Sequence, residues 1–99
     1  MSAASERASA CHLLLCAADL ATPGALCRGG RRRSPHLFPL VYAAEALGIR
    51  YGNKAWELAW AARVQVQTDR KLPVTGERVA PEVLLEAAAM LQSGWAPKP

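Results

Sequence analysis

The sequence predicts a mainly α-helical protein, a small single-domain bundle of three to four helices. Its 99 residues lie near the commonest domain length, which leaves room for one hydrophobic core. Twenty of these residues are alanine, the best helix former, whereas only 6% are aromatic. Several segments also combine apolar residues at helical spacing with a proline or a capping residue at the start. We therefore expect one domain over residues 1–99, with a helical core of small side chains.

The first helix is expected over residues 5–20, with Ser5 as its N-cap and Glu6 at the positive end of the helix dipole. Apolar residues occur on almost every side of this helix and form no single stripe, so it needs burial on several sides. Residues 22–36 combine prolines, glycines and arginines without an apolar pattern. We expect a flexible basic loop there.

Residues 39–93 are expected to complete the helical core. A short helix should begin at Pro39, which suits a first helical turn, and should end at Leu47, before Gly48 as its C-cap. The next helix should cover residues 53–64, with Asn53 as its N-cap and apolar residues spaced by three and four.

The segment over residues 64–75 has two interpretations. Apolar and polar residues alternate from Val64 to Thr68, which favours a small β-hairpin. The competing interpretation is a helix that continues through Gln67 and is followed by a loop, because an isolated two-stranded hairpin is marginal in water. A last helix should run over residues 81–93, and residues 95–99 should form an extended tail.

The stretch Ala43-Ala44-Glu45-Ala46-Leu47-Gly48-Ile49 resembles the first helix and turn of a helix-turn-helix motif, and the hairpin would be the wing of a winged-helix module. The stretch has a small residue where the helices would cross, a glycine suited to positive φ, and an apolar residue after it. In the usual register, the next buried positions fall on Lys54 and Glu57. One extra residue in the turn moves them to Ala55 and Leu58, which fits. The resemblance is to the motif and not to a particular family.

The charge balance makes nucleic acid the first candidate partner. The chain has 12 basic and 8 acidic residues, a net charge of +4, and nine of the basic residues are arginine. The resemblance implies a regulator that binds DNA or RNA, with the start of its second helix in the major groove and an arginine arm on the backbone or minor groove. The groove residues would be Arg50, Tyr51, Asn53 and Lys54, and the arm would be Arg31, Arg32 and Arg33. The same arginines are also compatible with a solubilising loop.

A protein partner is the second candidate. Trp56 and Trp60 are four residues apart on one helical face beside Arg63, so the guanidinium can stack on an indole. Tryptophan and arginine are frequent hot-spot residues of interfaces, although two tryptophans can equally give volume to an alanine-rich core. The alternative function is therefore a phage- or plasmid-type accessory protein that binds and inhibits a larger complex, such as a CRISPR effector or a transcription complex.

Other classes find little support in the sequence. No stretch without Asp, Glu, Lys or Arg exceeds eleven residues, whereas a membrane span needs ~20 apolar residues. The cysteines Cys11, Cys16 and Cys27 are odd in number, which argues against a disulfide framework and for a cytoplasmic protein. Their spacing matches no common zinc pattern, and no catalytic signature is present. We expect no enzyme activity, no cofactor and no metal, and a homodimer stays open.

Overall fold

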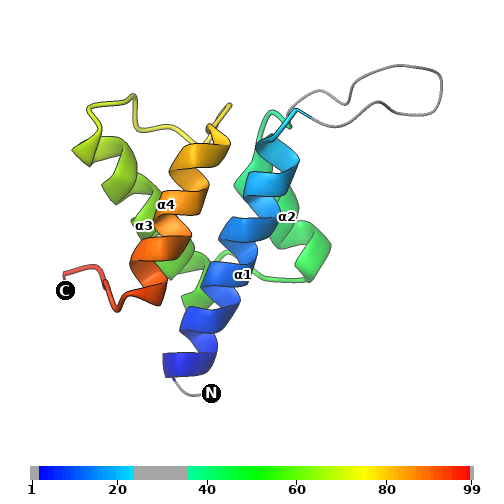
Figure 1. Ribbon diagram of the computed structural model, residues 1–99. Coiled ribbons are helices and arrows are strands. Elements are labelled where there is room, and N and C mark those ends of the chain that lie inside the picture. The colour runs from blue at the N-terminus through cyan, green and yellow to red at the C-terminus, as the bar shows by residue number, and fades with distance from the viewer. Residues whose placement is uncertain (1–2, 24–35, 99) are drawn as a thin grey trace.

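The computed structural model describes residues 3–23 and 36–98, which form four α-helices (Figure 1). The helices are α1 (Ala3–Ala21), α2 (Pro39–Leu47), α3 (Lys54–Asp69) and α4 (Pro81–Gln92). α1 packs against each of the other three helices, and α3 also packs against α4. Figure 1 shows α1 and α4 side by side, running in opposite directions. The predicted helical bundle is therefore confirmed for the described part of the chain.

α1 is the central helix, and its apolar residues reach all three neighbours. Leu13, Leu14 and Ala17 are fully buried. Of the twenty buried apolar residues in the described ranges, eleven are alanine. Because the alanine side chain is a single methyl group, it lets helix axes approach closely. The expected burial of this helix on several sides is confirmed, and so is the core of small side chains.

The helix termini follow local sequence signals, with one exception. Pro39 and Pro81 occupy the first turns of α2 and α4 as expected. The side chain of Asn53 accepts a hydrogen bond from the main-chain N–H of Ala55 at 2.8 Å, which confirms its role as the N-cap of α3. α1 begins at Ala3, so Ser5 lies inside the helix and its predicted capping role is wrong.

The predicted hairpin is also wrong, because residues 64–69 belong to α3 and residues 70–80 contain no strand. Val66 and Gln67 are buried on the inner side of α3, a position that a helix provides and an exposed hairpin does not. The carbonyl oxygen of Thr75 accepts hydrogen bonds from side chains of α3 in place of a strand partner. The competing interpretation, a longer helix followed by a loop, is confirmed.

The turn between α2 and α3 has the expected local geometry. Gly48 adopts a left-handed conformation with φ of 72°, and the N–H of Ile49 donates to the carbonyl oxygen of Ala44 at 2.9 Å. However, α2 makes its extended contact with α1 and not with α3, and the two helices diverge in Figure 1. The helix-turn-helix order is present along the chain, but its two helices are not a closely packed pair.

Candidate binding surface

Three aromatic rings follow one another where the turn after α2 leads into α3. The ring centroids of Tyr51 and Trp56 are 4.9 Å apart, and those of Trp56 and Trp60 are 5.4 Å apart. Tyr51 is 51% exposed and Trp60 is 38% exposed, whereas Trp56 is half-buried against the core. We call these three residues the aromatic surface. The rings form a continuous row that solvent reaches.

Arg63 lies beneath this row and supports it. Its side chain is 1% exposed, and its Cζ atom is 4.1 Å from the ring centroid of Trp60. The predicted stacking of a guanidinium on an indole is therefore present, with the cation on the buried side of the ring. Burial also lowers the pKa of Arg63.

Polar contacts hold the guanidinium of Arg63 in place. Nη1 donates to the carbonyl oxygen of Thr75 at 2.6 Å and also to Oε1 of Gln67. Nε2 of Gln67 donates to the same Thr75 oxygen at 2.9 Å. These bonds join α3 to the loop that follows it, and a Cβ added to Gly76 in that loop would lie 3.7 Å from two carbons of the Trp60 ring. Arg63 therefore supports Trp60 from below, and the loop passes close to one edge of its ring.

Tyr51 is positioned by a contact to α2. Its hydroxyl group donates to Oε1 of Glu45 at 3.2 Å. Desolvation raises the pKa of Tyr51, and the hydrogen bond to Glu45 and the negative charge of that carboxylate raise it further. The turn residue is thus joined to the preceding helix, which orients its ring toward Trp56.

Trp60 lines two hollows. The smaller, of about 230 Å³, is lined by the aromatic surface and Glu57. The larger, of about 750 Å³, lies between α3 and the C-terminal tail. Its lining residues are Trp60, Ala61, Val64, Gln65, Trp95, Ala96, Pro97 and Lys98. A partner that covers the exposed part of Trp60 therefore lies next to both hollows.

The C-terminal tail contributes to this site in a way that the sequence did not indicate. Nη1 of Arg7 donates to the carbonyl oxygens of Leu91 at 3.0 Å and Trp95 at 2.6 Å. The N–H of Trp95 donates to the carbonyl oxygen of Met90 at 3.0 Å. These contacts anchor the start of the tail to α1 and α4. The only available signal was a tryptophan in a short proline-containing segment.

The residues predicted to bind nucleic acid occupy different environments. Arg50, Tyr51 and Lys54 are exposed, whereas Asn53 is half-buried and its side chain caps α3. Arg31, Arg32 and Arg33 lie outside the described residues. Of the predicted partner-binding residues, Trp60 faces solvent, Trp56 also packs against the core, and Arg63 is buried as a support.

Comparisons with known proteins give no functional assignment, so any assignment depends on the residues of this chain. No family model, curated protein or solved structure matches the chain. Over residues 3–23 and 36–98, no three or more His, Cys, Asp or Glu side chains are grouped so as to hold a metal ion. No helix of this part of the chain combines the length and apolarity that crossing a membrane requires.

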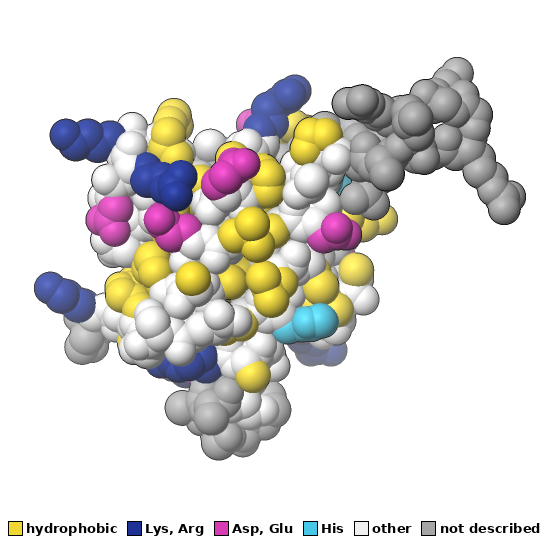
Figure 2. Space-filling view, viewed as in Figure 1, with side chains coloured by type: hydrophobic (Ala, Val, Ile, Leu, Met, Phe, Trp, Pro, Cys, Tyr) yellow, Lys and Arg dark blue, Asp and Glu magenta, His cyan; other side chains and the backbone are white. Residues whose placement is uncertain are grey.

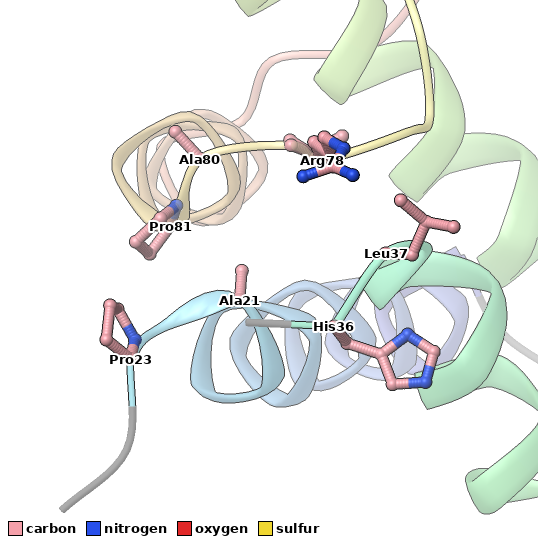
Figure 3. Close-up of a pocket in the computed structure, with 8 residues that line it drawn as sticks. Ala21, Pro23, His36, Leu37, Arg78, Ala80 and Pro81 are labelled. Carbon is pink, nitrogen blue, oxygen red and sulfur yellow. The ribbon is translucent and has the colours of Figure 1, made fainter. Parts of the chain in front are cut away.

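A third hollow, of about 700 Å³, lies where the end of α1 meets the segments that lead into α2 and α4 (Figure 3). Arg78 lines it, and its main-chain N–H donates to the carbonyl oxygen of Leu37 at 2.7 Å. The ring of His36 points away from Arg78 in Figure 3 and packs on Tyr42 with 4.3 Å between centroids. Because the imidazole of His36 does not point toward Arg78, we assign no chemical function to this hollow.

Proposed function

We propose that the protein is a non-catalytic binding protein that recognises a protein partner through the aromatic surface. The observation that carries this proposal is that Trp60 is 38% exposed although the buried Arg63 stacks on its ring. A large aromatic side chain that is already ordered loses little conformational entropy when a partner covers it. Tryptophan is among the residues most enriched at interface hot spots.

The charge of the helical part of the protein is compatible with a protein partner. Four of the 12 basic residues lie at positions 28 and 31–33, outside the described ranges, and the other eight are balanced by the eight acidic residues. The centre of a protein interface is enriched in aromatic residues, as the aromatic surface is.

Binding without catalysis would act by recruiting or blocking the partner. We favour the form of this proposal in which the protein is an accessory protein. It would inhibit a larger complex by covering one of the surfaces of that complex. The aromatic surface would supply the affinity, and the two hollows that Trp60 lines would supply shape selectivity for the partner.

The experiment compares three immobilised proteins: the natural chain, Trp60→Ala, and Leu85→Ala as a matched control. Leu85 is an exposed apolar residue of α4 outside the aromatic surface. We expect the natural chain and Leu85→Ala to retain the same protein in stoichiometric amount from a lysate of the natural host cell, and Trp60→Ala to lose it. Circular dichroism must show that both variants are folded. Equal retention by all three proteins contradicts the proposal.

Nucleic-acid binding is the second candidate. The net charge of the chain is +4, which equals the charge of the four arginines at positions 28 and 31–33. In addition, Arg50 and Lys54 are exposed at the start of α3. If this candidate is correct, a labelled duplex should bind with an affinity that falls steeply with salt. Alanine at Arg50 and Lys54 should weaken that binding by about 1 to 3 kcal/mol where they contact bases, without unfolding the domain. Alanine at Arg31, Arg32 and Arg33 should reduce the salt dependence. If the protein binds no duplex at low salt, duplex binding is excluded and the protein partner is the remaining candidate.

A further inference from the structure

A histidine and a cysteine come together on α1, away from the aromatic surface. His12 and Cys16 are one helical turn apart, and Nε2 of His12 is 3.7 Å from Sγ of Cys16. His12 is exposed and Cys16 is half-buried. Imidazole nitrogen and cysteine sulfur are the donors that zinc prefers in proteins.

The distance between these two donor atoms fits a zinc ion. With Zn–S of about 2.3 Å, Zn–N of about 2.05 Å and a tetrahedral angle, the two donors are about 3.6 Å apart. The observed 3.7 Å lies close to this value. A zinc ion can therefore bind both side chains with little rearrangement.

The other cysteine of this helix, Cys11, is unsuited to metal. Cys11 is buried, and its Sγ donates to the carbonyl oxygen of Ala88 at 3.7 Å. Burial raises the pKa of the Cys11 thiol, although Arg7 acts in the opposite direction. Cys11 therefore stays a protonated structural thiol between α1 and α4.

Within residues 3–23 and 36–98, one chain supplies only half of a closed zinc site. No group of three or more His, Cys, Asp or Glu side chains there could hold a metal ion, although Asp19 lines the same hollow as His12 and Cys16. Structural zinc ions have four protein ligands in a tetrahedron, so two more donors are needed. The pair lies on a hollow of about 380 Å³ between α1 and α2, whose rim carries the exposed apolar side chains of Leu15, Tyr42 and Leu47.

We propose that two copies of this chain share one zinc ion, with His12 and Cys16 of each copy as its four ligands. A two-fold axis through the ion would place the same patch of both copies face to face, which is the usual symmetry of a homodimer. Each Cys16 thiol releases one proton as its sulfur bonds to zinc, so two protons leave for each ion bound. The second copy would also cover apolar rim residues that one chain leaves in solvent. Figure 2 shows apolar side chains on the face of the molecule where α1 and α4 lie in Figure 1, with charged side chains mostly around them.

The test uses the full chain, reduced and freed of metal. Zinc chloride is added in steps while analytical ultracentrifugation measures the mass and competition with a chromophoric chelator measures the stoichiometry. We expect the mass to change from one chain to two, complete at one zinc ion for two chains. Cobalt(II) in place of zinc should show a thiolate-to-cobalt charge-transfer band and the strong visible bands of a tetrahedral site.

Variants decide which residues are responsible. Cys16→Ser and His12→Gln should each abolish zinc-dependent dimerisation, whereas Cys11→Ala and Cys27→Ser should dimerise as the natural chain does. Circular dichroism without metal checks that each variant is folded. An unchanged mass in zinc, a monomer that binds one ion, or a Cys16→Ser protein that still dimerises would overturn the proposal. None of these results bears on the aromatic surface, whose test needs no metal.

Discussion

α1 and α3 both have weak helical periodicity of their apolar residues, but for different reasons. α1 is apolar on most sides because three other helices enclose it. α3 buries the apolar residues Ala55, Ala59, Ala62 and Val66, but it also buries the polar Arg63 and Gln67 while Trp60 is exposed. The difference teaches that the same weak periodicity can indicate a helix that is contacted on several sides or a helix with a polar support inside and an aromatic residue outside.

The arrangement in α3 also has an energetic consequence. A buried guanidinium is costly, and Nε of Arg63 has no hydrogen-bond partner. Its bonds to Thr75 and Gln67 and its stacking on Trp60 offset part of that cost. α1 carries no such cost, because its buried residues are apolar. We therefore expect substitutions in the two helices to differ in size and in kind.

The largest effect is expected in α1. Leu14→Ala should lower the free energy of unfolding by about 3 to 5 kcal/mol, because Leu14 is fully buried and the alanine core around it cannot close the cavity. Leu15→Ala, one residue later, is the control: Leu15 is 43% exposed, and we expect a loss below about 1 kcal/mol. Urea denaturation measures both. If both substitutions lowered the free energy of unfolding equally, Leu14 would not be more deeply enclosed than Leu15.

The next effect concerns the buried cation of α3. Arg63→Ala should cost about 2 to 4 kcal/mol, because it opens a void beneath Trp60 and removes the hydrogen bonds to Thr75 and Gln67. Arg63→Met should cost less, since it keeps most of the volume and buries no charge. Denaturant unfolding of the two variants separates packing from hydrogen bonding. A methionine variant as unstable as the alanine variant would assign the role of Arg63 to its polar bonds.

Trp60→Ala should have a smaller effect on stability, about 1 to 2 kcal/mol. A fully buried tryptophan would cost about 3 to 5 kcal/mol, but part of the Trp60 ring already lies in solvent. Thermal and urea unfolding give the value, which is compared with partner binding by the same variant. A stability loss as large as that of Leu14→Ala would place Trp60 in the core and remove the main support for the aromatic surface.

The smallest effect is expected at Gly76. An added Cβ would lie 3.7 Å from two carbons of the Trp60 ring, which is ordinary van der Waals contact. Gly76→Ala should therefore change the free energy of unfolding by no more than about 0.5 kcal/mol. Gly48→Ala provides the contrast, because φ at Gly48 is 72° and a side chain there should cost about 1 kcal/mol. A large loss at Gly76 would mean that the loop beside Trp60 tolerates no added atom.

The candidate site was predictable only where residues are close in sequence. Trp56, Trp60 and Arg63 are three or four positions apart, so helical geometry brings them together in any helix. Nothing in that spacing indicates which of them is buried. Trp95 belongs to a distant segment, and its place on the hollow that Trp60 also lines depends on how α4 packs and on the hydrogen bonds from Arg7.

The sequence alone determined the helical class, the starts of α2, α3 and α4, and the left-handed turn at Gly48. These features depend on the missing N–H of proline, the side chain of Asn53 and the backbone freedom of glycine, all of which act within a few residues. Only the tertiary structure decided that residues 64–69 are helical, because the pattern of Val64 to Gln67 fits a strand or a helix equally well. It also decided that Arg63 lies inside and Trp60 outside. The physical reason is that burial depends on which neighbouring elements cover a side chain, and α1, α4 and the loop at Thr75 all lie outside α3 itself.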